Sequence, residues 1–401
     1  MSLLPVDDAL AQILKGVKPL GAVDVPLSNA HGRVLSGPLK AQRAQPPFAA
    51  SAMDGYAVRA ADIAEIPATL KVIGEAPAGH GFSGRVGKGK AVRIFTGAPM
   101  PRGADTVVIQ ENTETSGKDA VIVLESSTPG SFVRHAGLDF KKGETLLPRH
   151  TVLGARQIGL AAAMNHARVP VVRRPSVALL ATGDELVEPG SNPRDDQIIS
   201  SNALAIAAMI TRHGGEPVDL GIIPDKTARI EKAIERAAGS DILVTIGGAS
   251  VGDHDLVQAA MEKSGIKIGF WKIAMRPGKP LMFGKRGDQR VIGLPGNPVS
   301  AMVCTRLFIL PLIAKMTGDT RSFDPVAAVL DTGMARNDQR QDYIRATLAR
   351  GDKGQLVATP FPRQDSSMQR VFAEADCLVI RPPHAPAAKA GEQVQVLLLD
   401  F

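Results

Sequence analysis

The spacing of apolar residues changes character several times along this 401-residue chain. Residues 1–16, MSLLPVDDALAQILKG, place apolar side chains at helical spacing and predict an amphipathic helix. Residues 49–147 are β-rich, with strand-like runs between Gly and Pro clusters: TLKVIGEAPAG, KAVRIFTGAPMP, ADTVVIQEN and DAVIVLES. Helical spacing returns in TVLGARQIGLAAAMNHAR at 151–168, and VPVVRRP at 169–175 is typical of a linker.

Between residues 175 and 323, strand and helix patterns alternate. Strands are predicted at SVALLATG, PVDLGIIP, DILVTIGG, IGFWKIAM and RVIGLPGNP. Helices are predicted from Ser200 or Ser201 to Gly214, at KTARIEKAIERAAG, around 255–263, and at PVSAMVCTRLFILPLIAKM. This alternation indicates a mostly parallel, doubly wound sheet with helices on both faces.

From about residue 324 the pattern is β-like again, with a hairpin at RATLARGDKGQLVATP and strands at DCLVIRPP and EQVQVLLLD. The predicted fold is therefore an α/β central domain with β-rich N-terminal and C-terminal domains. The expected boundaries are 1–48 with 148–174 for a helical and linker domain I, 49–147 for β-rich domain II, 175–323 for α/β domain III, and 324–401 for a β-barrel-like domain IV.

Composition narrows the choice of partners. The formal net charge is +7, but no dense basic run occurs, so attraction of small anions is favoured over nucleic-acid binding. The two cysteines, Cys304 and Cys377, lie in apolar runs and the histidines are dispersed, which argues against structural zinc and suits a reducing cytosol. The N-terminus lacks a basic region before its apolar residues, and no apolar run reaches membrane-spanning length.

Two familiar phosphate-binding motifs are matched only in their letters. GHGFSG at 79–84 fits G-x-G-x-x-G, but GRVGKGK follows where a dinucleotide-binding loop must open a helix. Residues 84–90 fit G-x-x-x-x-G-K, but Ala91 stands where a P-loop needs Ser or Thr, and the strand-like AVRIF comes next. Both segments are predicted to be β-loops.

The strand ends of the central domain carry the candidate chemistry. In an open α/β sheet, ligands bind beyond the carboxyl ends of the strands. Five such loops follow the predicted strands: Thr182-Gly183-Asp184-Glu185, Pro224-Asp225, Gly247-Gly248-Ala249-Ser250 continuing to Asp253 and Asp255, Arg276-Pro277-Gly278-Lys279-Pro280, and Pro295-Gly296-Asn297-Pro298. If the sheet is parallel, these loops share one rim.

Glycine-lined backbone N–H groups and the cations Arg276 and Lys279 suit a phosphate or another oxyanion. The carboxylates would repel that anion unless a hard divalent cation such as Mg²⁺ lies between them. Each loop also has a purely structural interpretation, because TGDEL can be a turn with a helix N-cap and LPGNP a rigid turn. In the N-terminal half, composition alone indicates that Asp54 and Asp139 are turn-forming residues.

Six motifs occur in order: SAMDGYAV, IFTGAPMP, ATGDEL, TIGGASVGDHD, RPGKP and LPGNPVSA. Together they resemble the molybdopterin molybdenumtransferase family (MoeA-type, and the E domain of gephyrin) over nearly the whole chain. The resemblance implies a cytoplasmic, elongated four-domain homodimer with a molybdopterin-binding fold in its centre. It implies an enzyme that inserts molybdate into adenylylated molybdopterin and releases AMP in the presence of Mg²⁺. It also implies a cleft shared between subunits, with molybdopterin adenylyltransferase and cofactor-receiving enzymes as protein partners.

The resemblance also assigns site residues. It implies catalytic roles for Asp54, Thr96 and Asp139 of the second domain and for Glu185, Asp225 and Asp255 of the central domain. The metal ligands it implies are Asp184, Glu185, Asp225 and Asp255. The substrate-binding residues it implies are Thr182, Gly183, Gly247, Gly248, Ser250, Lys272, Arg276, Lys279, Pro295, Asn297, Arg345, Ser366 and Ser367.

The chain departs from the family pattern at two places. Many members have an acid before the first central helix, where this chain has Ser200-Ser201-Asn202, so no ligand role is assigned there. Arg276 stands where some relatives have Lys, and Arg can grip an oxyanion with a planar fork.

Two other functions use the same architecture. A molybdopterin adenylyltransferase shares the central fold, but the extra β-rich regions with their own motifs argue against it. A non-catalytic scaffold would need partner-binding insertions, and the chain has no long disordered linker.

Overall fold

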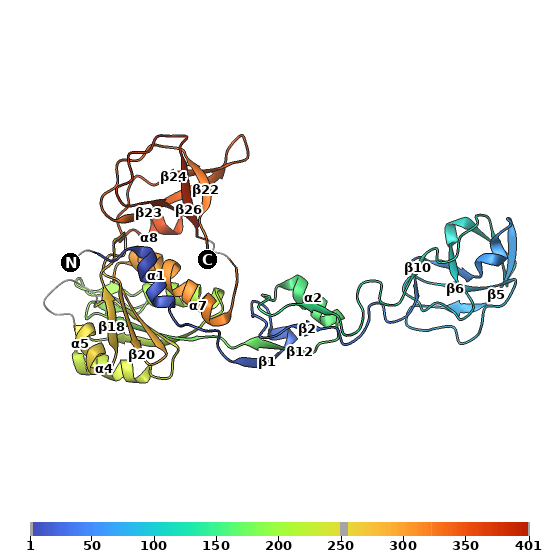
Figure 1. Cartoon of the computed structure of the whole chain (residues 1–401), viewed down its shortest axis with the longest axis horizontal. Helices are drawn as coiled ribbons and strands as arrows, with labels where there is room; N and C mark the ends of the chain where they lie inside the picture. The colour runs from blue at the N-terminus through green and yellow to red at the C-terminus, as the bar shows by residue number, and fades with distance from the viewer. Residues whose placement is uncertain (1–2, 249–255, 322, 400–401) are drawn as a thin grey trace.

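The computed structural model describes residues 3–248, 256–321 and 323–399. The molecule is elongated (Figure 1). Domains III and IV lie together at one end, domain I forms the narrow middle, and domain II lies at the far end. The chain starts at the broad end, runs out through the middle to domain II and returns, so domains I and II are built from its outward and returning segments.

Domain III is built on a six-stranded sheet with the order β16-β13-β17-β21-β20-β18. The first four strands are parallel, β20 is antiparallel to β21, and β18 is antiparallel to β20. The bounds are β13 Ser176–Thr182, β16 Glu216–Ile223, β17 Ile242–Ile246, β18 Lys267–Trp271, β20 Met282–Arg286 and β21 Gln289–Leu294. The predicted mostly parallel sheet is confirmed, although β20 was missed because its Gly- and Lys-containing sequence MFGKR reads as a turn.

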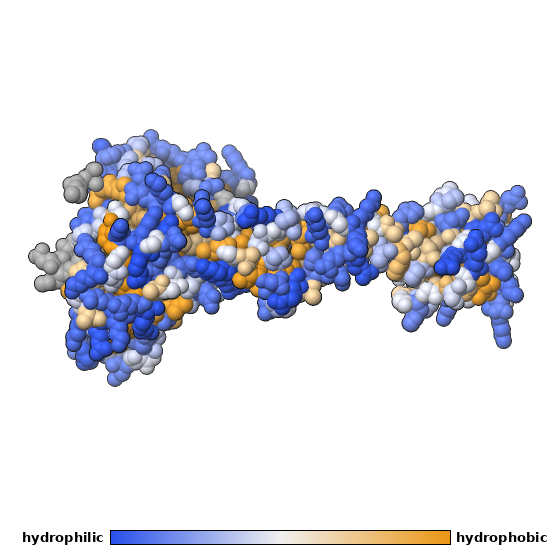
Figure 2. All heavy atoms as spheres, turned by 60° about the horizontal axis from the view of Figure 1, so that its bottom comes forward, coloured by the Kyte–Doolittle hydropathy of each residue, from blue (hydrophilic) through white to orange (hydrophobic). Residues whose placement is uncertain are grey.

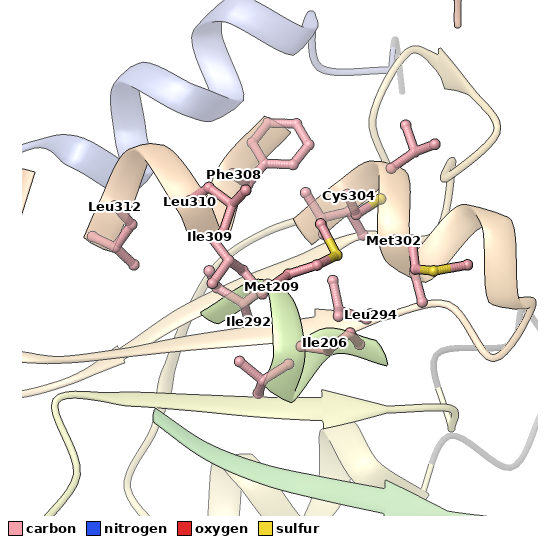
Figure 3. Packing of buried hydrophobic residues seen from close by; sticks show 14 of the residues in the cluster. Ile206, Met209, Ile292, Leu294, Met302, Cys304, Phe308, Ile309, Leu310 and Leu312 are labelled. Atoms are coloured by element: carbon pink, nitrogen blue, oxygen red, sulfur yellow. The ribbon is translucent and has the colours of Figure 1, made fainter. Parts of the chain in front are cut away.

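Helices cover both faces of this sheet. One apolar cluster contains Ile206 and Met209 of α3, Ile292 and Leu294 of β21 and the long helix beyond it, as Figure 3 shows. A second cluster joins α4 and α5 to the other face. The helical bounds are α3 Asn202–Arg212, α4 Thr227–Arg236, α5 Leu256–Lys263, α6 Pro298–Cys304, the π-helical turn η4 Thr305–Ile309 and α7 Leu310–Thr317.

The last predicted helix of domain III is one rod with an irregular turn. Pro311 lacks an N–H, and the π-helical turn Thr305–Ile309 immediately precedes the segment that contains it. The rod 298–317 is long and apolar enough to cross a membrane by length and composition, but 83% of it is buried inside the protein. Its apolar character is therefore accounted for by packing against the sheet.

Helix α1 (Val6–Leu14) belongs to the core of domain III. The prediction grouped residues 1–48 with domain I, but Val6, Ala9 and Ile13 pack into the same apolar cluster as the long helix. The apolar face of α1 is thus buried against domain III, and periodicity alone does not reveal which domain an amphipathic helix covers.

Domain I is a thin layer around a small core that includes Leu35, Leu153 and Met164. VPVV at 169–172 was predicted as linker, but it lies in a strand because Val169 and Val171 point into this core. The predicted helix 151–168 is shorter, since Asn165 takes a positive φ of 72° just after the helix. The elements are β1 Ala22–Pro26 paired with β12 Arg168–Val172, β2 Leu39–Lys40 paired with β11 Thr145–Leu147, the 3-10 turn η1 Leu27–Asn29 and α2 Ala155–Ala163.

Domain II contains a six-stranded sheet in the order β7-β4-β6-β5-β9-β8. Residues 79–90 contain no helix, so the rejection of both phosphate-loop motifs is confirmed. The bounds are β4 Gly55–Val58, β5 Ala68–Ala76, β6 Lys90–Ile94, β7 Thr106–Ile109, β8 Thr113–Ser116 and β9 Ala120–Val123, with the 3-10 turns η2 Ala60–Ile63 and η3 Gln110–Asn112 and the small pair β3 Ala50–Ser51 and β10 Val133–Arg134.

Domain IV is a closed barrel, as predicted. Its strands follow the order β23-β24-β22-β26-β25, and a β23–β25 pairing closes the ring. Strand β19 of domain III pairs with β23 and so joins the two domains. The bounds are β19 Met275–Arg276, β22 Val326–Leu330, β23 Gln341–Arg350, β24 Leu356–Pro360, α8 Gln369–Ala373, β25 Cys377–Arg381 and β26 Gln393–Leu398.

Gly55, inside SAMDGYAV, is required by a close backbone approach. A Cβ there would lie 1.9 Å from the carbonyl oxygen of Val108 on the neighbouring strand. We expect Gly55→Ala to destabilise domain II by about 1–3 kcal/mol or more, because the clash is with backbone. Limited proteolysis at increasing temperature measures this effect, as the temperature at which domain II becomes susceptible to cleavage.

The matched control is Gly87→Ala, where the nearest atom to a new Cβ is Lys90 Cδ at 3.9 Å. If Gly55→Ala were as protease-resistant as this control, the close approach would not constrain the sequence.

Candidate active site

The rim loops of domain III converge on one cavity of about 880 Å³. Because β18, β21, β17, β13 and β16 all point the same way, their carboxyl ends lie on one edge. The cavity is lined by Ala181, Thr182, Gly183, Glu185, Leu186, Ile198, Ile199, Ser200, Ser201, Asn202, Asp225, Ile246, Gly247, Gly248, Leu256, Val257, Pro280, Pro295, Gly296, Asn297, Pro298 and Ser367. The structure thus brings together residues from all five predicted loops.

Two positions of this rim require glycine, because neighbouring atoms leave no room for a Cβ. Gly247 has a φ of 90°, and a Cβ there would lie 2.7 Å from the Thr182 carbonyl oxygen. Gly248 has a φ of 67°, and its Cβ would lie 2.2 Å from a Val257 methyl group. The Thr182 hydroxyl beside them is buried and has no hydrogen-bond partner within the described structure. The backbone of this floor therefore faces the cavity without intervening side chains.

An acidic corner forms where the loops after β13 and β16 meet. The backbone N–H of Asp225 donates to Asp184 Oδ1 at 3.1 Å. Burial raises the pKa of the Asp225 carboxyl, and the neighbouring charges of Asp184 and Glu185 raise it further. Three carboxylates thus repel one another beside the glycine-lined floor, an arrangement more typical of functional sites than of structural ones.

Part of the predicted site lies outside the described residues, namely Ser250, Asp253 and Asp255. Within 3–248, 256–321 and 323–399, no three His, Cys, Asp or Glu side chains are arranged to hold a metal ion. The acidic corner therefore supplies an incomplete set of ligands in the described part of the chain.

Arg276 is not among the residues that line the cavity, and its role in binding an oxyanion stays a prediction. It forms an ion pair with Asp342 of domain IV and lies 3.6 Å from Asp338. Burial raises the pKa of Asp342, although the Arg276 charge opposes this effect. Arg276 therefore links domains III and IV through an ion pair.

The other two predicted cations, Lys272 and Lys279, are not among the residues that line the cavity. Lys272 has a positive φ of 73°, and its Nζ lies 4.2 Å from the centre of the Trp271 ring. Lys279 is exposed on the loop whose Pro280 lines the cavity.

Domain IV closes one side of the cavity through the loop 364–369. Asn297 Nδ2 donates to Ser366 Oγ at 2.8 Å, and the Val299 N–H donates to the Ser366 carbonyl at 3.1 Å. Ser367 lines the cavity itself. The predicted approach of Ser366 and Ser367 to the rim is thus present in the structure.

Arg345 does not contact the cavity. It is 1% exposed, and its guanidinium donates to Gln364 and to the Asp365 carbonyl. The side chain is enclosed within domain IV, and the substrate-binding role stays a prediction.

Sequence reasoning missed the segment 198–202, which lines the cavity. Its strand β15 (Ile198–Ile199) pairs with β14 (Leu186–Val187). Ser201 is the N-cap residue of α3, as predicted, but its hydroxyl accepts from Gln369 of domain IV at 2.6 Å instead of capping the helix. Adjacent polar residues before the helix were the available signal.

The residues predicted from the second domain lie apart from the rim, since Asp54 and Thr96 belong to domain II, which forms the far end of the molecule (Figure 1), and Asp139 lies at its junction with domain I. The N–H and hydroxyl of Thr96 both donate to Asp54 Oδ1 at 2.7 Å, and these bonds lower the pKa of Asp54. Asp139 lines a cavity of about 680 Å³ between domains I and II, together with Arg43 and Arg134. A single chain does not bring these residues to the rim of domain III.

Comparison with known proteins covers all four domains. Residues 4–165 match the MoeA N-terminal region (domain I and II), 178–315 a probable molybdopterin binding domain, and 327–399 the MoeA C-terminal region (domain IV). The Molybdopterin molybdenumtransferase of Nostoc sp. is 36% identical over 94% of this chain and 88% of that protein. The Haemophilus influenzae protein of the same name is 34% identical over 98% of both chains.

The fold is also that of a solved structure. The molybdopterin biosynthesis moeA protein from Pyrococcus horikoshii superposes with a TM-score of 0.85 at 30% sequence identity, and the match covers 100% of both chains.

The repulsion in the acidic corner predicts a pH-dependent effect on stability. Because the pKa of Asp225 is raised in the folded state, its ionised form destabilises the fold above that pKa. Below the ordinary aspartate value of 3.8 it is neutral in both states and the penalty disappears. We expect Asp225→Asn to raise the melting temperature at pH 7 in EDTA, with the gain shrinking as the pH falls towards 4.

Asp352→Asn, in the exposed turn after β23, is the control and should show no such pattern. A gain for Asp225→Asn that is independent of pH would rule out charge repulsion as its cause.

Proposed function

The chain belongs to the molybdopterin molybdenumtransferase (MoeA) family, and on that premise we propose that it inserts molybdate into adenylylated molybdopterin with release of AMP. The observation that supports this most directly is the cavity of about 880 Å³, which combines a glycine-lined floor, an acidic corner and a wall from domain IV. The relatives match along the full chain, domains II and IV included, which favours this activity over adenylyl transfer by the central domain or a scaffold role.

The floor suits the phosphate groups of the substrate. The loop after β17 presents Gly247 and Gly248 to the cavity, and only glycine tolerates the close approach there. The unpartnered Thr182 hydroxyl offers one further hydrogen bond. Lys279 and Lys272 belong to the segment that brings Pro280 to the cavity, and they would contribute a positive field that attracts molybdate and phosphate.

The acidic corner supplies part of a site for a hard divalent cation, because burial and the charges of Asp184 and Glu185 raise the pKa of Asp225 and a bound cation would relieve the repulsion. The residues that would hold Mg²⁺ are Asp184, Glu185, Asp225 and Asp255. When bound, Mg²⁺ would neutralise charge on the phosphoanhydride oxygens during release of AMP. The chain's own residues orient the anhydride against the floor, and the loop 364–369 restricts access from one side.

The second half of the cleft comes from a second copy of the chain. Asp54 and Asp139 belong to domain II and to the junction of domains I and II, away from the rim of the same chain (Figure 1). Exposed apolar side chains surround them, namely Phe48, Met53, Phe132 and Leu138, and Figure 2 shows apolar atoms at the surface where this end joins the middle of the molecule. A homodimer that places this end over the partner's rim would cover them. The two buried free cysteines are compatible with work in the reducing cytoplasm.

The activity is tested with purified protein, adenylylated molybdopterin, Mg²⁺ and molybdate or tungstate. We expect AMP release that EDTA abolishes and transfer of cofactor activity to an apo-molybdoenzyme. Glu185→Gln should lower the rate of AMP release at least about 100-fold, because a metal ligand is lost. Asp255→Ala should abolish metal-dependent release.

Glu188→Gln, an exposed neighbour on the same loop, is the control and should retain full activity. Consumption of ATP in the absence of adenylylated substrate would instead identify an adenylyltransferase.

The shared cleft predicts complementation between inactive variants. Asp54→Ala and Glu185→Gln are each expected to be inactive, but a mixed dimer contains one composite site with both residues intact. After random subunit exchange, about a quarter of the sites should be active, since half the dimers are mixed and each has one intact site. AMP release from the exchanged mixture measures this.

The same mixture assayed before exchange is the control. Activity that never exceeds the sum of the two variants would argue for a cleft formed within one chain.

A further inference from the structure

The side-chain amide of Gln364 uses its full hydrogen-bonding capacity within domain IV. Its Oε1 accepts from the N–H and the Nε of Arg345, both at 3.0 Å. Its Nε2 donates to the carbonyls of Arg345 at 3.0 Å and Phe361 at 2.9 Å. Two acceptor and two donor positions are therefore occupied, a pattern that an amide can satisfy and a carboxylate or an aliphatic side chain cannot.

The partner of this amide is the enclosed Arg345 on β23. Its Nε donates to Gln364, and its Nη1 donates to the Asp365 carbonyl at 2.7 Å. The guanidinium therefore holds two successive residues of the loop. Burial lowers the pKa of Arg345, and the nearby Asp365 charge opposes that effect. A buried cation is retained only where its hydrogen bonds are satisfied, so loss of Gln364 leaves the Arg345 Nε without a partner, while Nη1 keeps its bond to the Asp365 carbonyl.

The loop beyond this clamp carries the two serines at the cavity. Asp365 Oδ1 accepts from the N–H of Ser367 at 2.8 Å and from its hydroxyl at 2.7 Å. Ser366 is held from the opposite side, since its carbonyl accepts from Val299 and its hydroxyl from Asn297. The position of both serines is thus fixed between the β23 clamp and the rim of domain III.

We propose that Gln364 is a positioning residue, which together with Arg345 sets where Ser366 and Ser367 stand at the cavity. Gln364 itself is not among the residues that line the cavity. It acts on the reaction only through the loop, and its kinetic effect rests on the function proposed above.

The test compares Gln364→Leu with Gln364→Glu. Leu removes all four hydrogen bonds at similar size, whereas Glu keeps the acceptor towards Arg345 and loses both donors. We expect Gln364→Leu to lower kcat for AMP release about 100-fold, as small misplacements of reacting groups do, with KM for the pterin substrate within about twofold. Gln364→Glu should recover part of the loss.

Ser367→Ala and the double variant Gln364→Leu/Ser367→Ala complete a cycle. If Gln364 acts through Ser367, the double variant should be no slower than the slower single variant. Losses that multiply would show an independent structural effect and overturn the proposal. Gln355→Leu, at the exposed hairpin of the same barrel, is the matched control and should behave as the parent protein does.

Hydrogen exchange of the Val299 amide tests the clamp without any turnover, because this N–H is held by the Ser366 carbonyl. Gln364→Leu should accelerate its exchange at least about tenfold while the β25 amides remain protected. Unchanged protection of Val299 overturns the proposal. If the parent protein released no AMP, the proposed function would fail, and this exchange measurement would still decide whether Gln364 positions the loop.

Discussion

The parallel register of β13, β16, β17 and β21 is the constraint on which the candidate site depends. Each strand end delivers one short loop to the same edge, so residues far apart in sequence meet around one cavity. The reversal through β20 preserves this arrangement, because two antiparallel pairings return β18 to the direction of its neighbours. Where these loops crowd together, at positions 247 and 248, a residue with a Cβ would clash and glycine is required.

Domain IV completes that edge and is itself fixed to it at several points. Arg276 pairs with Asp342 across the boundary, and Asn297 and Gln369 make further bonds between the rim and the loop 364–369. Arg276, which the sequence predicts as an oxyanion ligand, thus also links the two domains. The cavity wall and the cations beside it are consequently coupled to how the barrel is seated on the sheet.

The sequence predicted the rim well because each strand end carries its own local signals, as in TGDEL and LPGNP. It failed where a side chain's partner lies far away in the chain. Arg276 and Asp342 are 66 residues apart in different domains, and nothing local to either reveals the pair. The apolar stripe of α1 likewise predicted a helix but not which domain it covers. The burial of Arg345 was likewise not predictable, because the residues that enclose it come from other parts of the barrel.

The placement of α1 also bears on how the chain is made. Val6, Ala9 and Ile13 leave the ribosome before domains I and II, yet the sheet that buries them begins at Ser176. Domains I and II are synthesised in between, so this apolar face waits without its final partner while two other domains fold. The large domain therefore cannot complete its core during translation until its own second half has emerged. An enzyme assembled in this order is exposed to non-native contacts early in its synthesis, at its first helix.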